Sequence, residues 1–285
     1  MQREPLRCTG VHRAARIACV AACALCLLCP GLPPSASAAD DDRLTKAAEL
    51  YAQVRSLRSE GRLEDALVLC GRVVALTEEA CGPDDPRTAT ALNNLATLLH
   101  TMGRYAEAEP AYLRAIGILE RGHESESRSI AAVLGNLAKL YGDTARYDLA
   151  ETTGRRALAL VERVQGPDHP DTALALGYLA GILSDVGRKE EAEGLYRRAA
   201  DVHTKASGPQ HPDTALALSN LASVCSDLGR YEEAEGLLKQ ALAIYQAVLD
   251  PSDGRMAAAI GNLGTLYQTV GRYEDAEPLC RRSVA

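Results

Sequence analysis

A short block of residues recurs six times along this chain at a fixed spacing of 42 residues. Its commonest form begins Gly-Arg-Tyr and ends in alanine at the sixth position. The first residue of the block stands at Gly61, Gly103, Ala145, Gly187, Gly229 and Gly271. Self-similarity at one fixed period is the signature of a repeat architecture, so we expect a stack of equal units rather than two ordinary globular domains.

Each unit is predicted to be a pair of helices. In the second unit, apolar residues recur at the spacing of one helix face, at Leu92, Leu95, Ala96 and Leu99. Gly103 follows at the position suited to a left-handed cap that ends the helix. The second helix is expected from about Arg104 to Arg121, with Ala108, Tyr112 and Ala115 on its inner face.

Small residues and prolines indicate how these helices pack. One position of the second helix is alanine in all six units, at Ala66, Ala108, Ala150, Ala192, Ala234 and Ala276. Only a small side chain lets two helix backbones approach to about 8 Å. The second proline of a Gly-Pro-x-x-Pro turn, as at Pro170, suits the first turn of the next helix. One hairpin cannot bury its own apolar face, so we predict an all-α, right-handed superhelical solenoid of about six helix-turn-helix units, the last truncated.

These motifs resemble those of the tetratricopeptide repeat (TPR) family. The 42-residue period, the Asn94-Leu95-Ala96 block and the Gly-Pro-x-His-Pro-x-Thr-Ala turn are similar to the kinesin-light-chain type. The resemblance covers about residues 43–285, so residues 39–285 are expected to form the solenoid. Two departures are a first unit without the Asn-Leu-Ala block and Tyr178 in place of asparagine in the fourth unit. The heptad region that pairs with kinesin heavy chain has no counterpart, so the resemblance implies no motor association.

The resemblance implies a concave groove, lined by the first helices, that accepts an extended peptide. The asparagine of the repeated block would bond the peptide, which selects Asn94, Asn136, Asn220 and Asn262. An amide suits this task because it offers an acceptor and two donors without a charge. The alternative is that these asparagines brace neighbouring helices. Other groove-facing positions would be Asn93, Thr97, His100, Lys139, Ser223, Thr265 and Gln268, and because they are small or polar no deep hydrophobic pocket is expected.

Three aspartates also recur at the 42-residue spacing, at Asp143, Asp185 and Asp227. They would form an acidic stripe that favours peptides bearing lysine or arginine. The alternative, which we favour, is that they pair with the arginine after each repeat position, at Arg146, Arg188 and Arg230, or are simply solvated. Surface pairs of this kind are common and contribute under roughly 1 kcal/mol.

The chain carries no recognisable catalytic or metal-binding motif. HExxH, a phosphate-binding glycine loop and a GxSxG turn are all absent, and no CxxC lies beyond residue 38. A formal charge of -7 argues against a nucleic-acid partner. We expect no enzymatic activity, no cofactor, no metal and no small-molecule substrate. His169 and His211 recur in the turn block and are expected to be structural.

The cysteines beyond residue 38 are expected to be structural thiols. Cys70, Cys225 and Cys280 occupy inner helix positions and should lie in the core. Cys81 stands at a helix end, where an intermolecular disulfide can form if the protein is exported.

Residues 1–38 are predicted to be a signal peptide or N-terminal hydrophobic targeting segment. Arg3 to Arg16 supply a basic region, Ile17 to Cys29 an apolar run, and Ala36-Ser37-Ala38 a cleavage site. The apolar run is shorter than the roughly 20 residues that span a bilayer. The protein would then be secreted or periplasmic; otherwise it would be cytoplasmic, with membrane attachment only through an uncleaved segment.

The sequence favours a non-catalytic protein–protein interaction scaffold that binds an extended peptide or protein partner in its groove. The alternative is the interaction arm of a larger, truncated signalling enzyme or ATPase. This alternative rests on the last helix, which stops at Ala285 without the capping element that solenoids usually need. Such an end could also support end-to-end self-association.

Overall fold

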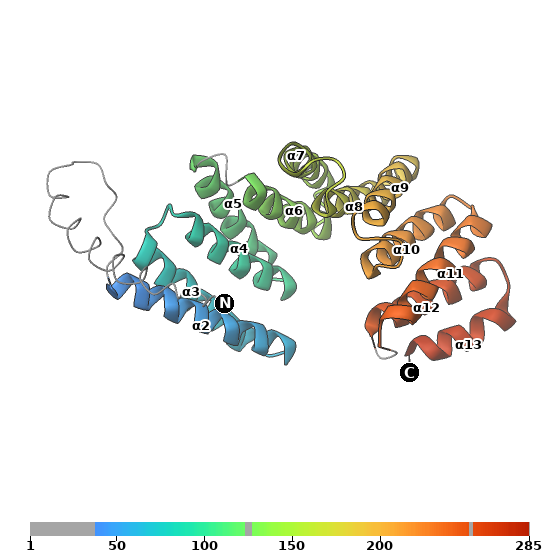
Figure 1. The fold of residues 1–285 in the computed structure, drawn as a ribbon, viewed down its shortest axis with the longest axis horizontal. Coiled ribbons are helices and arrows are strands. Elements are labelled where there is room, and N and C mark those ends of the chain that lie inside the picture. Colours follow the sequence, from blue (N-terminus) through green and yellow to red (C-terminus); the bar gives the residue numbers. More distant parts are fainter. Residues whose placement is uncertain (1–37, 123–126, 251–252, 285) are drawn as a thin grey trace, which may run out of the picture.

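The computed structural model describes residues 38–122, 127–250 and 253–284. The regular elements of these residues are α2 (Ala38–Ser59), α3 (Leu63–Cys81), α4 (Pro86–Thr101), α5 (Tyr105–Arg121), α6 (Ser127–Asp143), α7 (Tyr147–Gln165), α8 (Pro170–Asp185), α9 (Lys189–Ala206), α10 (Pro212–Asp227), α11 (Tyr231–Val248), α12 (Gly254–Thr269) and α13 (Tyr273–Val284). They form six antiparallel pairs that stack into an arch (Figure 1). The expected all-α solenoid is confirmed, whereas the predicted targeting segment lies outside the described residues except for Ala38.

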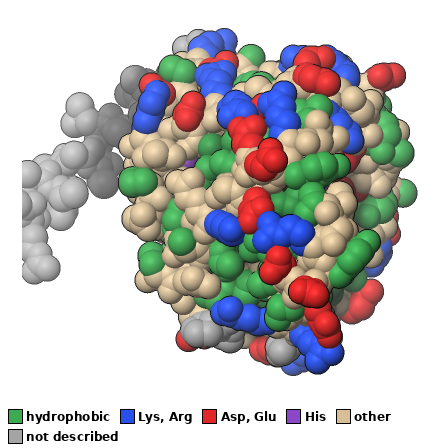
Figure 2. Space-filling model, turned by 90° about the vertical axis from the view of Figure 1, so that its right-hand side faces the viewer, with side chains coloured by type: hydrophobic (Ala, Val, Ile, Leu, Met, Phe, Trp, Pro, Cys, Tyr) green, Lys and Arg blue, Asp and Glu red, His purple; other side chains and the backbone are tan. Residues whose placement is uncertain are grey.

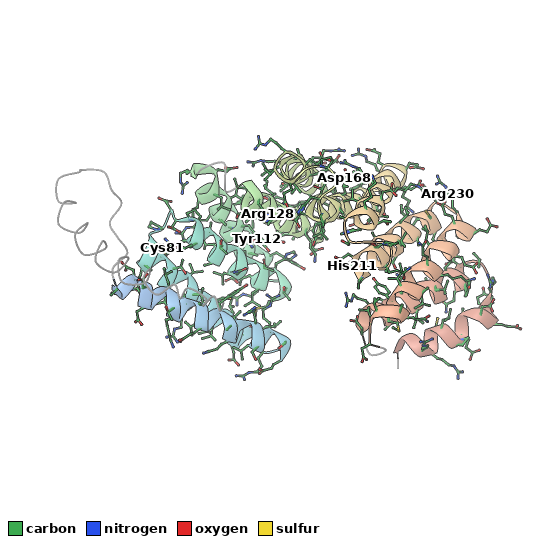
Figure 3. All side chains as sticks on the ribbon, viewed as in Figure 1. Cys81, Tyr112, Arg128, Asp168, His211 and Arg230 are labelled. Atoms are coloured by element: carbon green, nitrogen blue, oxygen red, sulfur yellow. The ribbon has the colours of Figure 1, made fainter. Side chains whose placement is uncertain are left out.

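The first helix of a unit begins where the sequence predicts, because a side chain caps it. His169 and His211 precede α8 and α10, and each Nδ1 accepts a hydrogen bond from the backbone N–H two residues later, at 3.1 and 3.2 Å. Pro170 and Pro212 are the first residues of these helices. The two histidines are therefore structural, as expected, and Figure 3 shows His211 at the opposite end of α10 from Arg230.

The repeat glycines end the first helices in the left-handed conformation. Gly61, Gly103, Gly187, Gly229 and Gly271 have φ between 72° and 83°. Ala145 occupies the equivalent position in the third unit with φ 56°, and it is the one non-glycine residue with positive φ among those described. The Cβ of alanine crowds the following carbonyl in this conformation, at a cost of roughly 1–2 kcal/mol.

Replacing Ala145 by glycine should therefore stabilise the chain. Removing the strain gains more than the extra entropy of glycine in the unfolded chain costs, for a net gain of about 0.5 kcal/mol. Denaturant unfolding followed by circular dichroism measures the change. Gly187→Ala is the reciprocal control and should destabilise the protein by about 1 kcal/mol. A loss of stability in Ala145→Gly would contradict this interpretation.

The core is built from small side chains between paired helices. The six repeated alanines of the second helices are at most 1% exposed. Tyr112 and Ala115 are also fully buried, so the predicted inner face of α5 is confirmed. Cys70 and Cys225 lie in the core as expected, but Cys280 is only partly buried. Cys81, the last residue of α3, is partly buried and carries a free thiol.

Candidate functional site

Two adjoining pockets lie on the first helices in the middle of the arch. One, of about 330 Å³, is lined by α6, α8, α9 and α10. The other, of about 540 Å³, is lined by α6, α7 and α8. Leu174 and Tyr178 of α8 line both pockets, so the two hollows meet over one helix.

Exposed apolar side chains line the two pockets. Leu174, Tyr178 and Leu216 have 46%, 48% and 44% of their surface exposed. These exposed leucines were not identified from the sequence, where polar positions of other units were considered. The units contributing Leu174 and Leu216 carry leucine where the second and third carry Thr90 and Ala132.

The smaller pocket is opened by glycines of α6 and α8. Gly181 stands where the other units carry Arg55, Thr97, Lys139, Ser223 and Thr265. A Cβ added at Gly181 would lie 3.4 Å from the Tyr196 hydroxyl oxygen, whereas one added at Gly177 would meet nothing within 4 Å. Any larger side chain at position 181 would therefore take up space beside Tyr196.

Two polar groups of α9 line the same pocket. Burial and the nearby charge of Asp185 raise the pKa of Tyr196 to about 12, so its phenol stays protonated. His203 is only 4% exposed, and its Nδ1 has no hydrogen-bond partner among the described residues. Burial lowers the pKa of His203 below its usual value, although Asp213 opposes the shift. Burial therefore favours the neutral form of this imidazole.

The asparagines of the repeated block do not act as a uniform set. Asn136 lines the larger pocket and Asn220 the smaller one. Asn136 also donates a hydrogen bond to the side-chain oxygen of Asn93 at 3.0 Å, so this pair braces α4 against α6. Neither pocket includes Asn94, which is partly buried, or Asn262, which is exposed.

The aspartates of the predicted stripe also differ from one another. Asp143 lies 2.7 Å from Nε2 of His100, and Asp227 lies 3.7 Å from Nζ of Lys189. Asp185 makes no ion pair with any described residue. Asp143 and Asp185 line the smaller pocket together with Lys139, whereas Asp227 lies outside it.

The predicted pairing of these aspartates with Arg146, Arg188 and Arg230 does not form. The other part of the favoured alternative, a solvated aspartate, fits Asp185, which is exposed. In the last four units, the arginine after the repeat position instead bonds a glutamate of the preceding unit, 37 residues earlier, in the pairs Arg146–Glu109, Arg188–Glu151, Arg230–Glu193 and Arg272–Glu235. The arginine reaches across the interface between units, because the second helix of the preceding unit begins there.

These pairs form a ladder that joins consecutive units. The hydrogen bond from Arg146 lowers the pKa of Glu109. Hydrogen bonds from Lys239, which has the largest effect, and from Tyr267 and Arg272 lower the pKa of Glu235 to about 2. On the C-terminal face of the arch, acidic and basic side chains alternate (Figure 2). The carboxylates of these pairs therefore remain ionised at neutral pH, so the Arg–Glu ion pairs between units are maintained.

No alternative site of another kind stands out in the described residues. None of their His, Cys, Asp and Glu side chains gathers into a group that could hold a metal ion. None of their helices combines the length and hydropathy needed to cross a membrane.

Sequence reasoning missed Leu174, Leu216, Gly181, Tyr196 and His203 as site residues. The available signal was a position-by-position comparison of units. In the fourth unit, Gly181 replaces Arg, Thr, Lys or Ser, and His203 replaces the buried side chains of Thr77, Leu119, Val161 and Tyr245. The sequence does not show that α8 and α9 bring these two unusual residues together in one pocket.

The tetratricopeptide repeat family matches this chain over residues 46–121, 129–205, 175–247 and 256–285. The chain belongs to this family, whose repeats form protein–protein interaction scaffolds that are generally non-catalytic. A search of curated protein sequences finds no significant match.

Solved structures share the fold at low sequence identity. BtubC (BKLC) from P. vanneervenii is 23% identical with a TM-score of 0.61, over 87% of this chain and 90% of that one. A Podosopora anserina kinesin light chain with nearly identical TPR-like repeats is 21% identical with a TM-score of 0.60, over 72% and 98%. Pseudomonas aeruginosa PilF is 15% identical with a TM-score of 0.54, over 84% and 90%. These TPR solenoids support the fold, including its kinesin-light-chain-like repeats.

Proposed function

We propose that this chain binds an extended segment of a protein partner along its first helices, with the site centred on α8. The observation that carries this proposal is the pair of adjoining pockets that share Leu174 and Tyr178. Exposed apolar surface rimmed by polar groups is typical of interaction sites.

The chemistry of the rim favours a peptide main chain. Asn136 and Asn220 each offer an amide at one of the two pockets, and an amide can bond both the N–H and the C=O groups of an extended segment. Leu174, Tyr178 and Leu216 would bury apolar side chains of that segment. The apolar contacts supply affinity and the amides set the register.

The double variant Asn136→Ala, Asn220→Ala tests this function. The probe is a dodecapeptide selected on the immobilised full chain from a phage-displayed library. We expect affinity to fall by about tenfold, because two hydrogen bonds of roughly 0.5–1.5 kcal/mol each are lost. Isothermal titration calorimetry measures the affinity, and circular dichroism verifies folding.

Asn93→Ala is the matched control. It breaks the bond between Asn93 and Asn136 but removes no amide that lines a pocket. It should leave peptide affinity nearly unchanged. Equal weakening by Asn93→Ala would show that bracing is the sole role of Asn136. An unchanged affinity in the folded double variant would refute the amide contacts, and failure to select any peptide would refute the proposed function.

A further inference from the structure

We propose that the smaller pocket is a specificity pocket for a lysine or arginine side chain of the bound segment. This inference rests on the proposed function and goes beyond it by naming a preferred side chain. It follows from the charge, the shape and the hydrogen-bonding groups of the pocket.

The charge of the lining is the first argument. Three aspartates, Asp143, Asp185 and Asp213, line the pocket against one basic residue, Lys139. His100 contacts Asp143 at 2.7 Å, and His211 lies 3.5 Å from Asp213. Asp185 makes no ion pair with any described residue, although the equivalent Asp227 is paired with Lys189. A cationic partner would neutralise Asp185.

The shape of the pocket is the second argument. Gly181 leaves room beside Tyr196 that a side chain at this position would take up, and the other units carry arginine, threonine, lysine or serine there. Leu174, Tyr178 and Ile182 supply apolar walls for an aliphatic stem. Lysine and arginine bury such stems while their charged ends reach polar groups. A Tyr178 ring that is half exposed can also attract a cation through its face.

The unpartnered polar groups are the third and independent argument. His203 lines the pocket with a buried Nδ1 that has no hydrogen-bond partner among the described residues. Asp185 can only accept hydrogen bonds when ionised, and a neutral imidazole nitrogen can accept one. A side chain rich in donors fits these groups, whereas a carboxylate would face Asp185 with like charge.

Oriented peptide libraries test the inference on the full chain. Each library is a set of nonapeptides with a fixed central lysine, arginine, norleucine or glutamate and random residues elsewhere. Norleucine resembles the lysine stem without its charge. The amount retained on the immobilised chain is measured by mass spectrometry. We expect the lysine and arginine libraries to be enriched about tenfold over norleucine, and glutamate to be retained least.

Two variants and two controls connect this preference to the pocket. Asp185→Asn should reduce the lysine and arginine enrichment to near that of norleucine, whereas Asp227→Asn should leave it unchanged. Gly181→Thr should lower the retention of lysine and arginine, while Gly236→Thr, at an exposed glycine of α11 with open space around it, should have no effect. Circular dichroism confirms that each variant is folded.

The outcomes separate this inference from the function on which it rests. Equal retention of lysine, arginine and norleucine, or equal effects of Asp185→Asn and Asp227→Asn, would overturn the charge preference and leave peptide binding intact. Retention of none of the libraries would overturn the proposed function as well.

Discussion

A chain carrying Leu174→Gln and Leu216→Gln is expected to lose affinity for a groove-selected peptide by about 30-fold or more. Burying each leucine side chain against the peptide contributes roughly 1 kcal/mol or more, and glutamine would instead lose hydrogen bonds to water. A total of about 2 kcal/mol corresponds to a factor of about 30 in the dissociation constant. Fluorescence anisotropy with the labelled dodecapeptide measures this loss.

The double variant should fold normally, because 46% and 44% of the two leucine surfaces are exposed in the free protein. Leu113→Gln, Leu149→Gln is the matched control. These leucines of α5 and α7 are 49% and 47% exposed and line neither pocket. An equal loss of affinity in the control would place the binding site elsewhere on the solenoid.

Ala192→Leu is expected to destabilise the protein by about 3 kcal/mol, near the upper end of the usual cost of overpacking. Ala192 is fully buried in a cluster with Leu179, Leu183 and Leu221. A leucine there would force α9 away from α8, and every unit of a solenoid depends on contact with its neighbours. Thermal melting should therefore begin at least roughly 6 °C lower.

The same substitution at an exposed position separates overpacking from a general effect of leucine. Ala106, in the first turn of α5, is exposed. Ala106→Leu should change the melting temperature by no more than about 2 °C. If Ala192→Leu melted at the temperature of the unmodified chain, close packing around the repeated alanine would be refuted.

The fold could be predicted from the sequence because it is specified locally in every unit. Three kinds of residue act within a few residues of their own position. They are the glycine or alanine that ends a first helix, the proline that begins the next first helix, and the alanine of the second helix between them. Repetition at a 42-residue spacing then made each local signal unmistakable. Helix α5, expected from about Arg104 to Arg121, spans Tyr105–Arg121.

The candidate site was only partly predictable, because it depends on contacts between units. Asn136, Asn220, Lys139 and Asp185 were expected at the groove and do line the pockets. The ion pairs were misassigned, since the partner of Arg146 lies 37 residues away in the preceding unit. The apolar pocket was missed because it, too, is formed by side chains from different units.

Amide hydrogen exchange of the full chain, with and without the selected dodecapeptide, tests the central claim most directly. The claim is that a partner segment lies along the first helices and is centred on α8. Peptide binding should slow exchange mainly in α6, α8 and α10, with the largest change in α8 between Leu174 and Ile182. Slower exchange confined to the second helices α7, α9 and α11, or to the terminal pairs α2–α3 and α12–α13, would contradict it.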